Sequence, residues 1–247
     1  MFDLNSISRG AALKAPRIVM MGVPGIGKTT WAAQAPKPIF LMTEDGMGNL
    51  DVPHFPLITK TDEVREAIEV LRTQEHDFET VVLDTADHLE YIIAGEIEAK
   101  YDAKELAYGK QAIKQQEVWQ ELLAGFNALR NERGMAVVIL AHVQIKRFDS
   151  PETEPYDRYT LKLSERSGSY LREWSDALLF ANYRTLIRKD DAGGFGKTNA
   201  RGITTGERLL FTSEKPAYTA KNRFSMPESI PMTWDAFVTA IEASRAK

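Results

Sequence analysis

The stretch GVPGIGKTT, residues 22 to 30, decides how the rest of the chain is interpreted. It satisfies the spacing G-x-x-x-x-G-K-[ST] through Gly22, Gly27, Lys28 and Thr29. Glycines allow backbone N–H groups to close around phosphate oxygens, and a helix that begins at Lys28 directs the positive end of its dipole toward them. The pattern therefore predicts a phosphate-binding loop.

This loop predicts ATP and Mg²⁺ as the bound nucleotide and metal. We expect Lys28 to reach the β- and γ-phosphates and the Thr29 hydroxyl to bind Mg²⁺. The nucleotide-contacting residues are then the whole stretch: Gly22, Val23, Pro24, Gly25, Ile26, Gly27, Lys28, Thr29 and Thr30.

Short apolar runs alternate with helical patterns on both sides of the loop. Expected strands cover 16–22, 38–43, 80–84 and 135–141, and apolar residues repeat at helical spacing in 62–72 and 119–129. Pro36 is expected to end the helix after the loop. This rhythm predicts an α/β fold with a mostly parallel central sheet and helices on both faces.

The chain of 247 residues is expected to form one domain. Within it we expect an N-terminal arm over 1–15, mobile loops over 144–167 and 188–206, and a C-terminal helix over 233–245. The second loop contains a Gly-rich stretch that also suits a hairpin, followed by an expected strand in 208–213.

Composition excludes several classes of function. The chain has no cysteine, which rules out a disulfide framework, a thiolate nucleophile and a cysteine-ligated zinc finger. No signal peptide or membrane span is apparent, since the longest apolar run, 135–141, is strand-sized, and we expect a cytoplasmic location. The net charge of −4 gives no overall argument for nucleic acid, although 184–223 carries nine basic and four acidic residues.

Two carboxylates are candidates for the metal and for the attacking water. Asp84 ends a hydrophobic strand, where such folds hold Mg²⁺ through water. An AAA+ motor has a Glu directly after this acid, but here Thr85 follows, which weakens that interpretation. RecA-type ATPases have the catalytic Glu at the end of the strand after the loop helix, where this chain has Glu44 with Asp45 as its rival.

The segment AKNRF, residues 220 to 224, resembles the lysine-x-arginine signature of the RadA/Sms family of RecA-related ATPases. From Arg17 to about Pro227 the chain is similar to the compact phage RecA/RadA-like members, linked to recombination and single-strand annealing. The resemblance implies that Lys221 and Arg223 reach the ATP site of an adjacent subunit in a ring or filament. Ser225 replaces the Gly that ends the motif, and the zinc finger and protease-like tail of RadA/Sms are absent from the sequence.

The resemblance further implies partners and a sensor residue. His142 matches the polar position that senses the γ-phosphate, although RecA itself has Gln there. The partners would be single-stranded DNA, other copies of this chain and, as a further candidate, a single-strand-binding protein, with no membrane. The location would be the bacterial host's cytoplasm if the protein is phage-encoded.

Two segments with interleaved basic and aromatic residues are candidates for the DNA surface. The second also carries five acids and is close to neutral, so its affinity should be modest and salt-sensitive. The candidates are Lys100, Tyr101, Lys104, Tyr108 and Lys110 in the first segment, and Lys146, Arg147, Phe148, Arg158, Tyr159 and Lys162 in the second.

The function predicted from these features is a Mg²⁺-dependent ATPase that couples nucleotide turnover to single-stranded DNA. Two other interpretations stay open. One is a nucleotide-controlled scaffold or loader that does not touch DNA, which the acidic composition allows. The other is a small-molecule kinase, which also uses one phosphate loop but needs an acceptor pocket and works as a monomer.

Overall fold

A central sheet of parallel strands organises the molecule. The computed structural model describes residues 3, 14–191 and 198–245. Five parallel strands lie in the order β2-β3-β4-β1-β6, so the strand that precedes the phosphate loop has a neighbour on each side. Their bounds are β1 (Arg17–Gly22), β2 (Pro38–Met42), β3 (Thr80–Asp84), β4 (Ala136–Phe148) and β6 (Ala177–Asp191).

Antiparallel strands extend this sheet beyond β6. The sheet continues through β7 (Thr198–Phe211) to β9 (Ser229–Pro231), and the short β8 (Lys221–Asn222) pairs with the beginning of β6. The second half of β4 continues past its parallel neighbours and pairs with β5 (Tyr156–Leu161). The parallel part therefore has the architecture that the alternating pattern predicts.

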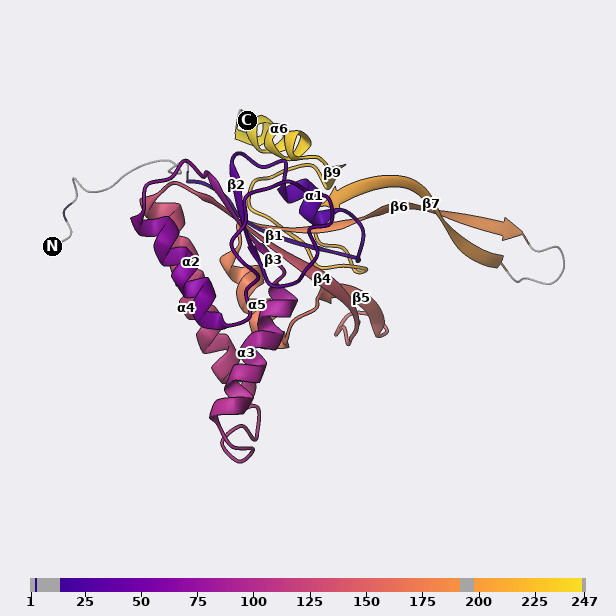
Figure 1. Ribbon diagram of the computed structural model, residues 1–247. Helices are drawn as coiled ribbons and strands as arrows, with labels where there is room; N and C mark the ends of the chain where they lie inside the picture. Colours follow the sequence, from indigo (N-terminus) through magenta and orange to yellow (C-terminus); the bar gives the residue numbers. More distant parts are fainter. Residues whose placement is uncertain (1–2, 4–13, 192–197, 246–247) are drawn as a thin grey trace.

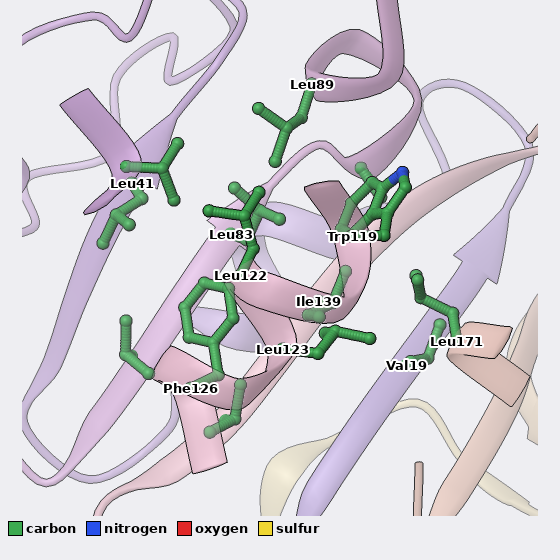
Figure 2. Close-up of a cluster of buried hydrophobic side chains, with 14 of the residues drawn as sticks. Val19, Leu41, Leu83, Leu89, Trp119, Leu122, Leu123, Phe126, Ile139 and Leu171 are labelled. Atoms are coloured by element: carbon green, nitrogen blue, oxygen red, sulfur yellow. The ribbon is translucent and has the colours of Figure 1, made fainter. Parts of the chain in front are cut away.

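One face of the sheet is covered by four helices. Side chains alternate along the strands, so that Val19 and Met21 join this core while Ile18 and Met20 point to the other face. The stripe predicted on the long helix is confirmed, since Trp119 and Phe126 are fully buried in the cluster that Figure 2 shows. The helices are α2 (Thr61–Thr73), α3 (Ala86–Lys100), α4 (Lys110–Glu132) and α5 (Glu165–Trp174).

The opposite face is covered by α1 (Lys28–Ala32) and α6 (Trp234–Arg245), as Figure 1 shows. Trp31 and Trp234 meet with ring centroids 4.8 Å apart, and Phe237 packs against both rings. Two layers of helices on one sheet confirm the predicted fold class. The helix after the phosphate loop ends at Ala32, earlier than Pro36 required.

The segment 144–167 is not a loop, contrary to expectation. β4 continues to Phe148 and then returns as β5, which forms an antiparallel hairpin before the first turn of α5. The strand was underestimated because its apolar run stops at Ala141, whereas the exposed second half is polar and is held by pairing with β5.

Most of 188–206 is also strand, because β6 and β7 form a long hairpin that extends from the body of the molecule in Figure 1. Residues 192–197, and nearly all of the expected N-terminal arm, lie outside the described residues. The C-terminal helix is confirmed as α6. Within the described part of the chain, no helix combines the length and apolar character needed to span a bilayer.

Candidate active site

The predicted phosphate loop follows the carboxyl end of β1. A β-carbon on Gly22 would lie 2.9 Å from the Ala181 carbonyl oxygen, so a larger residue would push β1 and β6 apart. Gly25 and Gly27 have φ angles of 74° and 102°, which favour glycine. Ile26 is fully buried beneath the loop and anchors it. The glycines of the motif are therefore required by the backbone.

Lys28 lies inside this loop with only 6% of its surface exposed. Its Nζ donates to the carbonyl oxygens of Gly22 and Val23 over 3.3 and 3.4 Å. Burial lowers the pKa of Lys28, against the attraction of Asp84, Asp87 and Glu44. Among the described residues, no carboxylate forms an ion pair with this ammonium group, so the buried cation favours an anion in the loop.

Thr29 and Asp84 meet where a metal ion would bind. Thr29 Oγ1 donates a hydrogen bond of 2.7 Å to Asp84 Oδ2, which joins α1 to the end of β3. Burial raises the pKa of Asp84, since its carboxylate is only 2% exposed. In the described part of the chain no cluster of three acidic or histidine ligands occurs. Two oxygen ligands suit Mg²⁺, which usually keeps several waters and takes phosphate oxygens.

Glu44 follows β2 beside this pair. The backbone N–H of Thr43 donates to the Asp84 carbonyl, and the Thr43 hydroxyl exchanges two hydrogen bonds of 2.8 Å with the backbone of Thr85. Glu44 Oε2 lies 3.5 Å from His88 Nε2, and 27% of its side chain is exposed. Asp45 is exposed. The clamp through Thr43 therefore holds Glu44 more firmly than its rival.

The expected position of His142 was the end of its strand, but the residue lies in the middle of β4. Up to His142 the strand pairs with β1, and from Val143 it pairs with β5, so His142 marks the point where β4 leaves the central sheet. Its neighbours in the order of strands are the phosphate-loop strand and the Asp84 strand. The side chain therefore sits between the two halves of the predicted site.

Asp87, which sequence reasoning missed, holds His142. The His142 backbone N–H donates to Asp87 Oδ1 over 2.9 Å, and Nδ1 lies 3.0 Å from Oδ2. Burial alone would raise the pKa of Asp87, but the hydrogen bonds from His142 outweigh it and lower the pKa to about 2. The spacing D-x-x-D at the start of a helix was the available signal.

Lys221 and Arg223 lie toward the beginning of the parallel strands, whereas their own phosphate loop follows the carboxyl end of β1. Lys221 aligns with Leu178 at the start of β6, whereas Gly22 aligns with Ala181 further along the same strand. Lys221 Nζ donates 2.7 Å bonds to the last carbonyls of α5, those of Arg172 and Glu173. Burial and the nearby arginines lower the pKa of Lys221 to about 8.

Arg223 belongs to a cluster of basic groups around one acid. Its Nη1 lies 3.6 Å from Asp176, which also pairs with Arg17 at 2.8 Å and Arg130 at 3.3 Å. Half of the Arg223 side chain is exposed. The two residues of the AKNRF segment are therefore separated from the Lys28 site of the same chain.

The two candidate DNA segments differ in what they expose. In the first, Tyr108 is fully exposed at the turn between α3 and α4, whereas the Tyr101 ring is covered by Lys114 Nζ at 3.7 Å. In the second, Arg158 is only 8% exposed and pairs with Glu214. The Tyr159 ring stacks on Phe180 with centroids 5.2 Å apart.

The charges of the second segment are also occupied within the chain. Lys146 pairs with Glu165, Arg147 lies 3.6 Å from Asp149, and Lys162 lies 3.8 Å from Asp87. Phe148 stays partly exposed. Among the aromatic candidates of the two segments, Tyr108 of the first is the most exposed, and DNA binding by either segment stays a prediction.

Together, the loop with its buried lysine and the Thr29–Asp84 pair at the ends of parallel strands define a P-loop ATPase. The chain belongs to the AAA domain family, whose model matches residues 14–224. No curated protein matches the sequence.

The family match supports nucleotide-dependent ATPase activity without deciding between types of catalytic acid. In the sequence, Thr85 follows Asp84 at the position where an AAA+ motor has a Glu. In the structure, the Thr85 backbone bonds to the Thr43 hydroxyl, so that position clamps two strands together. A different carboxylate, that of Glu44 in the segment after β2, lies close enough to Asp84 to help raise its pKa.

Proposed function

We propose that this protein is a Mg²⁺-dependent ATPase of the RecA type that forms oligomers and couples ATP turnover to single-stranded DNA. The phosphate loop would bind the β- and γ-phosphates through its backbone N–H groups and through Lys28. When bound between Thr29 and Asp84, Mg²⁺ would neutralise developing charge on the phosphate oxygens. Lys28 is buried and forms no ion pair with a carboxylate among the described residues, which supports phosphate binding at this site.

Glu44 would orient the attacking water and accept its proton. The clamp between Thr43 and Thr85 fixes the backbone that carries Glu44, and His88 lies against its carboxylate. As an imidazolium, with Nδ1–H donating to the Asp87 carboxylate, His142 would also donate a hydrogen bond from Nε2 to the γ-phosphate. In this way the state of the nucleotide would be communicated to the β4–β5 hairpin that begins one residue later.

Lys221 and Arg223 would complete the ATP site of a neighbouring copy. The observation that carries this proposal is their position at the start of β6, away from their own phosphate loop at the other end of the parallel strands. A cationic residue supplied in trans to phosphoryl transfer increases the rate by about 10³ to 10⁵. Hydrolysis would then require assembly.

The turn between α3 and α4 is the surface that best supports DNA binding. Tyr108 there is fully exposed and available for base stacking, with Lys104 and Lys110 beside it. Figure 1 shows this turn at the end of a helical projection from the body. Because the net charge of this segment is modest, we expect its affinity for DNA to be modest and to fall as the salt concentration rises.

Electron microscopy with a non-hydrolysable ATP analogue, with and without single-stranded DNA, tests assembly and partner together. A ring or filament that forms with nucleotide and contains DNA supports the whole proposal. Fluorescence anisotropy of a labelled oligonucleotide at several salt concentrations adds the affinity. Nucleotide-dependent assembly without any DNA binding would replace the proposal by that of a loader or scaffold, and a dispersed monomer that hydrolyses ATP at full rate would overturn the shared site.

A further inference from the structure

Arg208 of β7 lies against the phosphate loop although it is 181 residues from it in sequence. A β-carbon on Gly27 would lie 2.9 Å from Arg208 Nη1, so the guanidinium occupies the space beside the loop that glycine leaves open. β7 is separated from β1 by β6, and the long arginine side chain spans that separation. Nothing in the sequence motif identifies this residue.

The backbone at this point directs Arg208 toward the loop. Arg208 pairs with Tyr183, but Thr204 pairs with Thr185, so three residues of β7 face the single Arg184 of β6. Gly206, within this bulge, has a φ of 78°. Such insertions bend a strand and re-aim its side chains. Figure 1 shows that the β6–β7 hairpin leaves the body beyond this region.

The charge around Arg208 favours an anionic ligand. In the described part of the chain no carboxylate forms an ion pair with Arg208, whereas the nearby Arg184 pairs with Glu207 over 2.9 Å. Lys28, on the same loop, also has no acidic partner among the described residues, and it is 94% buried. Two cations that form no ion pair among the described residues, beside a loop of backbone N–H groups, suit a phosphate group, and arginine can bind phosphate oxygens with two parallel hydrogen bonds.

We propose that Arg208 binds the phosphate chain of the nucleotide held by the same subunit, and so connects that nucleotide to the base of the β6–β7 hairpin. This inference rests on nucleotide binding in the proposed function but on neither assembly nor DNA. It differs from the role of Lys221 and Arg223, which lie away from their own phosphate loop. The observation that supports this proposal is the position of the Arg208 guanidinium beside Gly27.

Titration with a fluorescent ATP analogue tests the contact. Arg208→Ala should weaken binding at least 10-fold, Arg208→Lys should recover part of the loss, and the matched control Arg184→Ala should bind like the wild type. Inorganic tripolyphosphate, used to displace the analogue, should lose the same factor in Arg208→Ala, because the contact is to phosphate. An unchanged inhibition constant for tripolyphosphate would place the guanidinium on the base or ribose and overturn the proposal.

Further measurements distinguish a loss of fold, a failure of the proposed function, a failure of this inference alone and a contact made across subunits. Thermal unfolding without nucleotide, for Arg208→Ala and Arg208→Gln, should match the wild type, because the side chain is exposed and has no ion pair with the described acidic residues. If the wild type binds no ATP analogue, the proposed function fails; if it binds and both variants bind equally well, this inference alone fails. Restored binding when Arg208→Ala is mixed with Lys28→Ala would show contact across subunits and overturn a contact within one.

Discussion

The hydroxyl of Thr29 donates a 2.7 Å hydrogen bond to the carboxylate of Asp84, and this bond joins α1 to the end of β3. In the sheet, β4 separates β3 from β1, the strand that precedes the phosphate loop. Burial raises the pKa of Asp84, with the bond from Thr29 opposing that shift. A divalent cation at this point would stabilise the ionised carboxylate. The pair is therefore the place where we propose that Mg²⁺ and the nucleotide phosphates meet the sheet.

Replacing Asp84 by Asn, or Thr29 by Ala, should abolish Mg²⁺-dependent hydrolysis. Loss of one group that stabilises the transferring phosphate costs about 10² to 10³ in rate. Nucleotide affinity measured with a chelator present should stay within about threefold, because Lys28 and the loop backbone are unchanged. Thr73→Ala on α2 is the control, since its hydroxyl bonds only within its helix. Full Mg²⁺-dependent turnover in Asp84→Asn would remove the metal from this position.

Glu44→Gln should bind ATP and hydrolyse it at least about 100-fold more slowly, because an amide cannot accept the proton of the attacking water. Asp45→Asn should retain turnover, since that carboxylate is exposed and lies outside the clamp through Thr43. Steady-state phosphate release and filter binding measure the two properties separately. The reverse result, with normal Glu44→Gln and inactive Asp45→Asn, would assign the water to Asp45.

The features that could be predicted from the sequence are those with a short repeating pattern. The phosphate loop has a fixed spacing that its backbone geometry requires, and the buried strands alternate between two apolar cores. Trp119 and Phe126 repeat at helical spacing because one face of α4 is buried. In each case the pattern reflects neighbours close in sequence or a uniform environment.

Features that depend on distant contacts could not be predicted. The second half of β4 is exposed, and its extended form depends on pairing with β5. Arg158 looks like a free surface cation in the sequence, but Glu214 and the surrounding chain bury it. Arg208 reaches Gly27 from a position 181 residues away in sequence, next to an irregularity in the pairing of β6 and β7.

Mixing two inactive variants tests the shared ATP site. Lys28→Ala retains Lys221 and Arg223 but has a defective loop, whereas Arg223→Ala retains an intact loop but lacks the residue donated to a neighbour. If the residue acts in trans, the mixture should regain up to about a quarter of wild-type activity, carried by interfaces that combine an intact loop with an intact arginine. Activity that stays at the level of the separate variants would contradict the model.

Arg223→Ala and Lys221→Ala should change the stability of the protein only slightly. Arg223 is half exposed and 3.6 Å from Asp176, so Arg223→Ala should cost at most about 1 kcal/mol. Lys221→Ala removes two hydrogen bonds to α5 carbonyls and should cost about 1 to 2 kcal/mol, or a few degrees in Tm. Thermal unfolding of the two variants distinguishes loss of activity from loss of fold.

The bond between Asp87 and His142 predicts a specific acid dependence of stability. The pKa of Asp87 is lowered to about 2 from its ordinary value of 3.8, so its carboxylate contributes stability that is complete above about pH 4 and lost as the pH falls toward 2. The contribution is roughly 2 kcal/mol. Urea unfolding of the wild type and Asp87→Asn should differ by this amount at neutral pH.

The difference should then shrink between about pH 4 and pH 2, since protonation of Asp87 makes the wild type resemble the amide variant. Glu69→Gln provides the matched control, because Glu69 is an exposed carboxylate paired with Arg72 and should contribute little at any pH. A difference between the wild type and Asp87→Asn that stays constant over this pH range would show that the carboxylate is not stabilised by His142, and the orientation of the histidine would need another cause.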